Sequence, residues 1–296
     1  MSESTDGTVS WAELMASIAE TIGDRVAAKW LCEHASGAES AAEFDAMRHD
    51  LVSARAGLHL DAMARRLLGG EPLQYVMGRW AFRRLDLLVD RRVLIPRADT
   101  ETLVEVALQS LATRRTTREE PAVVADLGTG SGAVGLALLD ESPLGSLTVW
   151  MTDASQDALD VARANAAGLG RRGGGARFAL GSWFDALPAE LRGSFDVIVS
   201  NPPYIAVGDV EVDEQVRTWE PHDALFAGAD GLDAVRTIVS GARDWLTPGG
   251  ALAVEIGHTQ AGAVSELMRE AGFVDVNVRR DAAGRERVVV SRASGE

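Results

Sequence analysis

From Pro121 onward, segments typical of strands alternate with segments typical of helices, and this alternation constrains the fold most. Short β-branched runs predict strands, and longer stretches with apolar residues at helical spacing predict the helices between them. Strands are expected at residues 123–127, 147–152, 177–180, 195–200, 251–256, 274–278 and 287–291, and helices at 133–139, 156–167, 232–245 and 261–271. This order predicts an α/β domain with a Rossmann-like sheet of seven strands. The sheet is expected to be parallel except for its last strand, which follows the sixth through a short connection.

The residues before this region divide into a helical part and a hairpin. Residues 9–70 show only helical patterns, including a third helix over 41–56 and a fourth over 60–68, so residues 1–73 predict a small helical bundle. Such a bundle is either a stabilising cap or a substrate-recognition module. Apolar residues then alternate, with Asp90-Arg91 at the expected turn, and predict a β-hairpin linker over 74–97. The α/β domain takes residues 98–296 and opens with a helix over 100–111 and a charged connection over 114–120.

Composition excludes several classes of protein. The formal net charge of -15 argues against a broad grip on nucleic acid, which needs a basic surface. No apolar run approaches the length of a membrane span, and the polar N-terminus lacks the features of a signal peptide. Cys32 is the only cysteine, and the histidines near it fit no zinc pattern, so we expect no metal site. A cytoplasmic monomer without a stable nucleic-acid or membrane partner is therefore expected.

A glycine-rich turn follows the first predicted strand. Its residues are Asp126, Leu127, Gly128, Thr129, Gly130, Ser131 and Gly132. Glycines at alternate positions let the backbone turn sharply and approach a ligand closely. Gly130 to Gly135 fits the dinucleotide fingerprint GxGxxG, but the turn also fits an S-adenosylmethionine site in which Asp126 faces the methionine ammonium. Asp153 ends the next strand, where an acid binds ribose hydroxyls in either cofactor. A tight turn without a ligand is the remaining alternative.

A second motif, Asn201-Pro202-Pro203-Tyr204, follows the fourth predicted strand and favours methyl transfer over hydride transfer. The prolines cannot continue a strand, so they fix an extended loop at the edge where α/β sheets bind ligands. The Asn201 side-chain oxygen and the Pro202 carbonyl are each expected to accept one N–H of a planar –NH2 group, aiming the nitrogen lone pair at a methyl group. Tyr204 is expected to stack on that group. A purely structural turn is the alternative.

These motifs resemble those of the HemK-like protein-(glutamine-N5) methyltransferases, in particular the branch that modifies peptide chain release factors. The resemblance extends over most of the chain from Gly70 onward. It includes Gly70-Glu71-Pro72-Leu73-Gln74-Tyr75, Leu94-Ile95-Pro96-Arg97, Thr100-Glu101, Asn165, Trp183-Phe184, Glu220-Pro221 and Glu255-Ile256-Gly257 with Gln260. Ala98-Asp99 departs from the Pro-Glu that is usual in this family.

The resemblance implies a class I methyltransferase fold that uses S-adenosyl-L-methionine and releases S-adenosyl-L-homocysteine. It implies cofactor contacts at Gly128 to Gly132, Asp153, Trp183 and Asn201, and substrate contacts at Asn201, Pro202, Pro203 and Tyr204. The implied reaction methylates the side-chain amide nitrogen of the glutamine in the Gly-Gly-Gln motif of class I release factors. A ribosomal-protein glutamine methyltransferase and an adenine-N6 DNA or RNA methyltransferase remain alternatives. A non-catalytic binding protein on the same sheet is a further one.

Overall fold

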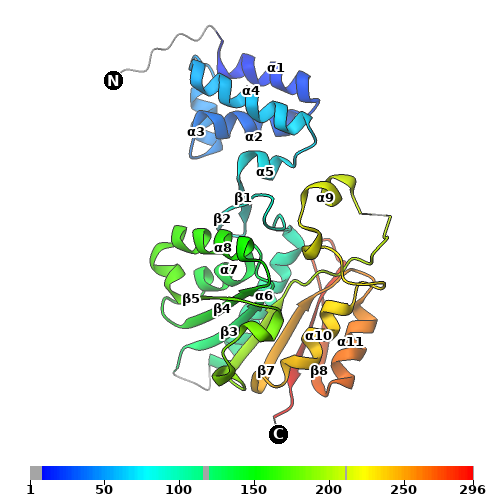
Figure 1. Ribbon diagram of the computed structural model, residues 1–296. Helices are drawn as coiled ribbons and strands as arrows, with labels where there is room; N and C mark the ends of the chain where they lie inside the picture. Colours follow the sequence, from blue (N-terminus) through cyan, green and yellow to red (C-terminus); the bar gives the residue numbers. More distant parts are fainter. Residues whose placement is uncertain (1–8, 116–119, 211, 296) are drawn as a thin grey trace. The chain divides into compact units, whose positions relative to one another are not determined.

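The computed structural model describes residues 9–115, 120–210 and 212–295. Most of the polar N-terminus and residues 116–119 of the charged connection therefore lie outside the described residues. The chain divides into two compact units, Met1–Gly78 and Arg79–Glu296 (Figure 1). The linker boundaries inferred from the sequence, 74 and 97, stay a prediction. None of the helices in the described ranges has the length and apolar character that crossing a membrane requires.

The first unit consists of helices α1 (Trp11–Ile22), α2 (Arg25–Ser36), α3 (Ala41–Met47), α4 (Ala54–Leu68) and α5 (Leu73–Met77). Its core includes Leu31 and Leu60, and the ring of Trp11 packs edge-on against Phe44 at 6.0 Å between centroids. The predicted helix over 41–56 is wrong, because the chain leaves the helical conformation after α3. Ser53 then caps α4 by accepting a hydrogen bond from the backbone N–H of Ala56, so the fourth helix begins earlier than predicted.

The second unit begins with a hairpin of β1 (Arg79–Phe82) and β2 (Leu85–Leu88). Its turn lies at Arg83-Arg84, so the turn predicted at Asp90-Arg91 is wrong. Arg83 takes the left-handed conformation (φ 52°), and its guanidinium pairs with Glu141 on a later helix. Asp90 instead closes a local turn by accepting a hydrogen bond from the backbone N–H of Arg92.

The sheet of the second unit has the strands that the sequence predicts. They are β3 (Ala122–Leu127), β4 (Leu147–Asp153), β5 (Ala176–Leu180), β6 (Phe195–Ser200), β7 (Leu246–Glu255), β8 (Phe273–Arg280) and β9 (Glu286–Ala293). Their order is β5-β4-β3-β6-β7-β9-β8, and β9 runs antiparallel to both of its neighbours. The prediction of a seven-stranded sheet with an antiparallel last strand is confirmed.

Helices cover both faces of this sheet, which explains why every residue of β6 is buried. They are α6 (Glu101–Arg115), α7 (Ala133–Glu141), α8 (Gln156–Gly168), α10 (Asp233–Ala242) and α11 (Ala261–Glu270), while the short helix α9 (Glu214–Trp219) belongs to the segment between β6 and α10. Helices α10 and α11 pack on one core that includes Ile198 of β6, while α6 contacts β6 and β7 as well. The short helix α9 was not predicted from the sequence. Figure 1 shows α7 and α8 beside β4 and β5, and α10 and α11 beside β7 and β8.

The buried side chain of Asn165 ties the hairpin to the glycine turn. Its Oδ1 accepts a hydrogen bond from the backbone N–H of Leu88 (2.7 Å), and its Nδ2 donates to the carbonyls of Leu88 (3.0 Å) and Ser131 (2.8 Å). An asparagine can make this bridge because it carries a donor and an acceptor on one short side chain. The hairpin is thereby fixed to helix α8 and to the turn.

We predict that Asn165→Ala lowers the free energy of unfolding of the second unit by about 2–4 kcal/mol, because three backbone groups lose their partner. Urea denaturation followed by circular dichroism measures this change. Asn277→Ala is the matched control, since the Asn277 amide donates only to the carbonyl of Asp275 at an exposed site. Equal stability of the two variants would contradict the bridging role of Asn165.

Candidate active site

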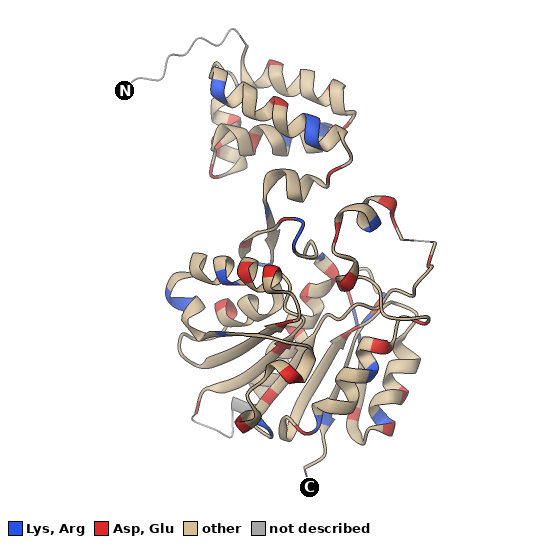
Figure 2. Ribbon diagram, in the orientation of Figure 1, with Lys and Arg blue, Asp and Glu red and all other residues tan. Residues whose placement is uncertain are grey.

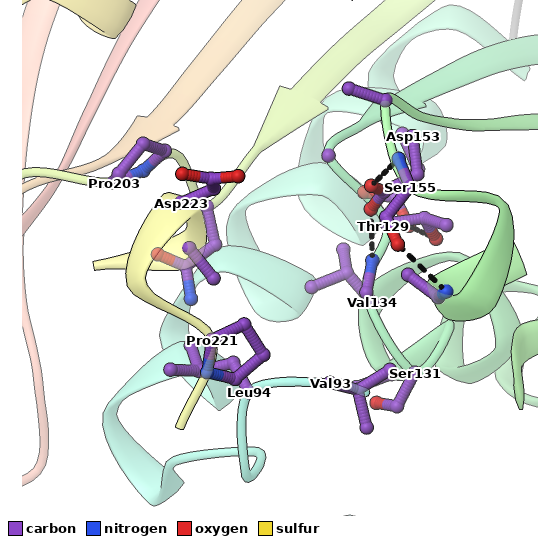
Figure 3. A pocket seen from close by; sticks show the side chains of 18 of the residues that line it. Val93, Leu94, Thr129, Ser131, Val134, Asp153, Ser155, Pro203, Pro221 and Asp223 are labelled. Atoms are coloured by element: carbon purple, nitrogen blue, oxygen red, sulfur yellow. Dashed lines mark hydrogen bonds between the residues drawn. The ribbon is translucent and has the colours of Figure 1, made fainter. Parts of the chain in front are cut away.

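A cavity of about 500 Å³ opens at the carboxyl ends of β3, β4 and β6. The strand order reverses between β3 and β6, because β4 and β5 lie to one side and β7 to the other. Ligands of open α/β sheets bind at such a reversal. The cavity is lined by these predicted site residues: Asp126, Gly128, Thr129, Gly130, Ser131, Asp153, Trp183, Asn201 and Pro203. Figure 3 shows Asp153, Ser155 and Thr129 on one side of the cavity and Pro203, Pro221 and Asp223 on the other.

The glycine turn takes a conformation that side chains disfavour. Gly128, Gly130 and Gly132 all have positive φ angles, of 71°, 55° and 86°. The backbone N–H groups of Gly128 and Thr129 both donate to the carbonyl of Thr152, which joins the turn to the end of β4. A Cβ on Gly132 would lie 2.9 Å from side-chain atoms of Leu136 and Met151. Gly132 is not part of the cavity lining, but its positive φ angle and the close packing around it explain why the turn has a glycine at this position.

Asp126 brings a buried carboxylate to the cavity wall. The residue is 2% exposed, and its Oδ2 accepts hydrogen bonds from Thr129 Oγ1 (2.6 Å) and from the backbone N–H of Gly135 (3.0 Å). Burial raises the pKa of Asp126 to about 6, and these two hydrogen bonds offset part of the rise. A cation beside this carboxylate would remove the unfavourable effect of burial, so the site favours a positively charged ligand group.

Asp153, the last residue of β4, brings a second carboxylate to the cavity. Its Oδ2 accepts from the backbone N–H of Gly130 (2.9 Å), and its Oδ1 accepts from the N–H of Ser155 (2.9 Å). Burial raises the pKa of Asp153 above its ordinary value, against the effect of these hydrogen bonds. Each carboxylate oxygen has a second lone-pair direction, so Asp153 can still accept hydrogen bonds from ligand hydroxyls.

Trp183 lies over the glycine turn in an unfavourable backbone conformation. Its φ of 46° is in the left-handed region, which costs a residue other than glycine on the order of 1–3 kcal/mol. The ring is so close to Gly128 that a Cβ there would be 3.5 Å from Trp183 Cζ3. This conformation places an aromatic ring at the cavity wall, beside the backbone of the turn.

The Asn201-Pro202-Pro203-Tyr204 loop is fixed by side chains from other segments. Asn201 Nδ2 donates to Thr100 Oγ1 (3.3 Å), and Gln260 Nε2 donates to the Tyr204 carbonyl (3.0 Å). Gly231 lies so near that a Cβ there would be 2.3 Å from the same carbonyl oxygen. The loop therefore holds one defined conformation beside the cavity.

The four residues of this loop are placed differently. Asn201 and Pro203 line the cavity, whereas Pro202 is buried and Tyr204 is only partly exposed, and neither is part of the lining. Among the described residues, no hydrogen-bond donor pairs with the carbonyl of Pro202. Burial raises the pKa of Tyr204 to about 12, and the charge of Glu255 adds to the rise. Tyr204 is therefore a neutral phenol. The catalytic and binding roles of these residues stay predictions.

Another part of the cavity wall comes from segments to which no site role was assigned from the sequence. Glu220 is 4% exposed and accepts hydrogen bonds from the backbone N–H of Ile95 (3.1 Å) and from the guanidinium of Arg97 (2.5 Å). This contact joins the loop after the hairpin to the segment that contributes Pro221 and Asp223 to the cavity. The sequence signal that pointed to this segment was Glu220-Pro221 in the family resemblance, but it did not indicate a contact with residues so distant in the chain.

The residues present fit an S-adenosylmethionine-like cofactor. Asp126, Asp153 and Asp223 line the cavity, and the guanidinium that also lines it, from Arg92, is already paired with Asp90 (2.6 Å). A ligand with a sulfonium and an ammonium group suits this acidic lining. Because the glycines of the turn have no side chains, a ligand can approach the backbone of the turn closely. A dinucleotide would instead bring two phosphates to carboxylates, which is unfavourable. No cluster of side chains suitable for a metal ion occurs in the described ranges.

The sheet order, the glycine turn and the acids at the ends of β3 and β4 define a class I methyltransferase. Residues 101–218 match the family model of the methyltransferase small domain. The chain is 43% identical to a release factor glutamine methyltransferase of Xylella fastidiosa, over 95% of this chain and 98% of the relative. It is 42% identical to the enzymes of that name from Burkholderia pseudomallei (92% and 93% of the two chains) and Bordetella pertussis (89% and 93%). The chain belongs to the release factor glutamine methyltransferase family.

We predict that Asp126→Asn makes the ligand-free protein about 1–3 kcal/mol more stable at pH 7. Both hydrogen bonds of the carboxylate go to one oxygen, which asparagine retains, whereas the buried charge disappears. The pKa of Asp126 in the folded protein, about 6, exceeds its ordinary value of 3.8. The protonated carboxyl therefore contributes its full stabilisation of the wild type below pH 3.8, and this contribution is lost as the pH rises through 6. Urea denaturation between these pH values measures the difference. A difference that does not shrink at low pH would contradict the assignment to this carboxyl.

Proposed function

We propose that this protein transfers a methyl group from S-adenosyl-L-methionine to the side-chain amide nitrogen of the Gly-Gly-Gln glutamine of class I peptide chain release factors. The observation that carries the proposal is the position of Asn201. Its amide lines the same cavity as Asp126 and Asp153, so an acceptor –NH2 at Asn201 would be next to a cofactor held by the acids. Membership of the family supports the choice of glutamine.

Asn201 and Pro202 supply the means of activating a poor nucleophile. The lone pair of an amide nitrogen is delocalised into the carbonyl, so it attacks only when its orientation is fixed. Asn201 Nδ2 is engaged by Thr100, which leaves Asn201 Oδ1 to accept one N–H of the substrate. We expect the Pro202 carbonyl, which has no donor among the described residues, to accept the other N–H. Both acceptors stabilise the positive charge that develops on nitrogen.

S-adenosylmethionine held by Asp126 and Asp153 would supply an electrophilic methyl group on a sulfonium, and the sulfur would keep the bonding electron pair. The substrate nitrogen forms the new C–N bond with its lone pair and afterwards loses one proton to solvent. The rigid proline loop and the Trp183 ring limit the positions that the acceptor and cofactor groups can take. A strong general base is not required, because the nitrogen becomes acidic once it carries the methyl group.

Adenine-N6 methylation is the main chemical alternative, since an adenine amino group poses the same problem. The net charge of -15 disfavours it, because binding to DNA depends on neutralising phosphates. Figure 2 shows acidic residues distributed over the helices and loops of both units. A ribosomal-protein glutamine remains the nearest alternative substrate.

One experiment separates these substrates. The protein is incubated with labelled S-adenosylmethionine and, in separate reactions, with a purified release factor, ribosomal proteins and duplex DNA. We expect label on the release factor, lost when its Gly-Gly-Gln glutamine is replaced by alanine. Label on DNA or ribosomal protein, with none on the release factor, would overturn the proposal.

We predict that Asn201→Ala lowers kcat by about 10²–10³-fold, because it removes one acceptor that stabilises the developing charge. Titration calorimetry should show that S-adenosylmethionine still binds, since Asp126 and Asp153 are intact. Asn277→Ala, at an exposed site distant in the chain, serves as the control and should leave the rate unchanged. Retention of full activity by Asn201→Ala would show that this loop has been assigned the wrong role.

A further inference from the structure

A buried carboxylate without a hydrogen-bond partner lies close behind the proposed acceptor site. Glu255 is the last residue of β7 and is 1% exposed. Neither of its carboxylate oxygens has a hydrogen-bond partner among the described residues. Leaving a buried carboxylate unpaired costs several kcal/mol, so such a group points to a role. Glu255 is not part of the cavity lining, and any effect on the reaction must pass through a neighbour.

Thr100 is that neighbour. It lines the cavity, is 3% exposed, and its Oγ1 accepts the hydrogen bond from Asn201 Nδ2 (3.3 Å). Its hydroxyl also stabilises the ionised form of Glu255, although its position does not meet the geometry of a hydrogen bond to either oxygen. The Thr100 hydroxyl thus interacts with both the Glu255 carboxyl and the Asn201 amide.

We propose that Glu255 is a positioning residue for methyl transfer, acting through the Thr100 hydroxyl to keep the Asn201 oxygen directed at the acceptor. This inference rests on the proposed function. A hydroxyl has one hydrogen, and an ionised carboxylate is an acceptor only, so the field of Glu255 turns that hydrogen toward itself. The hydroxyl lone pairs then face Asn201 and can bind only its –NH2 group. The amide oxygen is left for the substrate.

Protonation of Glu255 would reverse this arrangement. Burial raises the pKa of Glu255 to about 7, with the Thr100 hydroxyl and the charges of Arg287 and Arg97 lowering it and the charge of Asp99 raising it. A protonated Glu255 no longer carries the charge that holds the hydroxyl hydrogen of Thr100, so that hydrogen is free to bind the Asn201 oxygen. The substrate then loses its acceptor. The active form is therefore the ionised one, and activity rises as the pH increases through about 7.

The test compares the full-length wild type with Glu255→Gln, measuring kcat and KM for methylation of a release factor from about pH 5.5 to about pH 9. Glutamine keeps the size of the side chain and, like the protonated acid, carries no charge. We expect kcat to fall by about 10–100-fold at high pH and to lose its rise near neutrality, while cofactor binding by calorimetry is unchanged. Glu266→Gln on the exposed face of α11 is the control and should keep the wild-type profile.

Thr100→Val provides an independent variant, in which Glu255 is intact but the hydroxyl is absent. We expect its kcat to be low and independent of pH near neutrality, whereas Thr100→Ser should restore the rise. A wild-type pH profile in either Glu255→Gln or Thr100→Val would overturn the role of Glu255 without affecting the proposed function. Absence of methyl transfer to release factor by the wild type would instead overturn the proposed function.

Discussion

Burial of carboxylates at one edge of the sheet is the constraint on which the site depends. Asp126, Asp153 and Glu255 stand at or next to the carboxyl ends of β3, β4 and β7, and burial raises the pKa of all three. Two of them are partly stabilised by backbone N–H groups, and Glu255 has no such donor among the described residues. An edge built in this way is stabilised by positive charge. The electrostatics of this edge therefore favour a positively charged ligand group.

The walls of the site depend on side chains that hold distant backbone. Asn165 binds the backbone of the hairpin, Glu220 binds the N–H of Ile95, and Gln260 binds the carbonyl of Tyr204. Each of these side chains is polar and is positioned by a helix or an adjacent loop of the second unit. Because hydrogen bonds to backbone fix a loop without a regular element, three irregular segments can form one rigid cavity.

The sequence predicted the elements whose signals are local and missed those that distant contacts decide. The strands were found because apolar runs end at glycine, proline or a polar residue, and the turn 126–132 because only glycine fits its backbone. The hairpin turn was predicted at the wrong place because aspartate, here Asp90, is common in turns. Asp90 does accept a hydrogen bond from the backbone N–H of Arg92, but this local turn does not join two paired strands. The hairpin expected over 74–97, with its turn at Asp90-Arg91, would have put residues 93–95 in its second strand, yet the backbone N–H of Ile95 is bound by Glu220, 125 positions away. No spacing pattern encodes such a pair.

One buried arginine links Asp99, which stands where glutamate is usual in the family, to the protonation state of Glu255. Arg287 is 6% exposed, and its guanidinium pairs with Asp99 (3.0 Å) and Asp281 (3.2 Å) while donating to the Ile256 carbonyl (3.3 Å). The shorter aspartate therefore still reaches a cationic partner. Because Arg287 already neutralises these two acids, its charge compensates Glu255 only in part. The resulting excess of negative charge, together with burial, holds Glu255 near the midpoint of its titration at neutral pH, where a small change in the site can change its protonation.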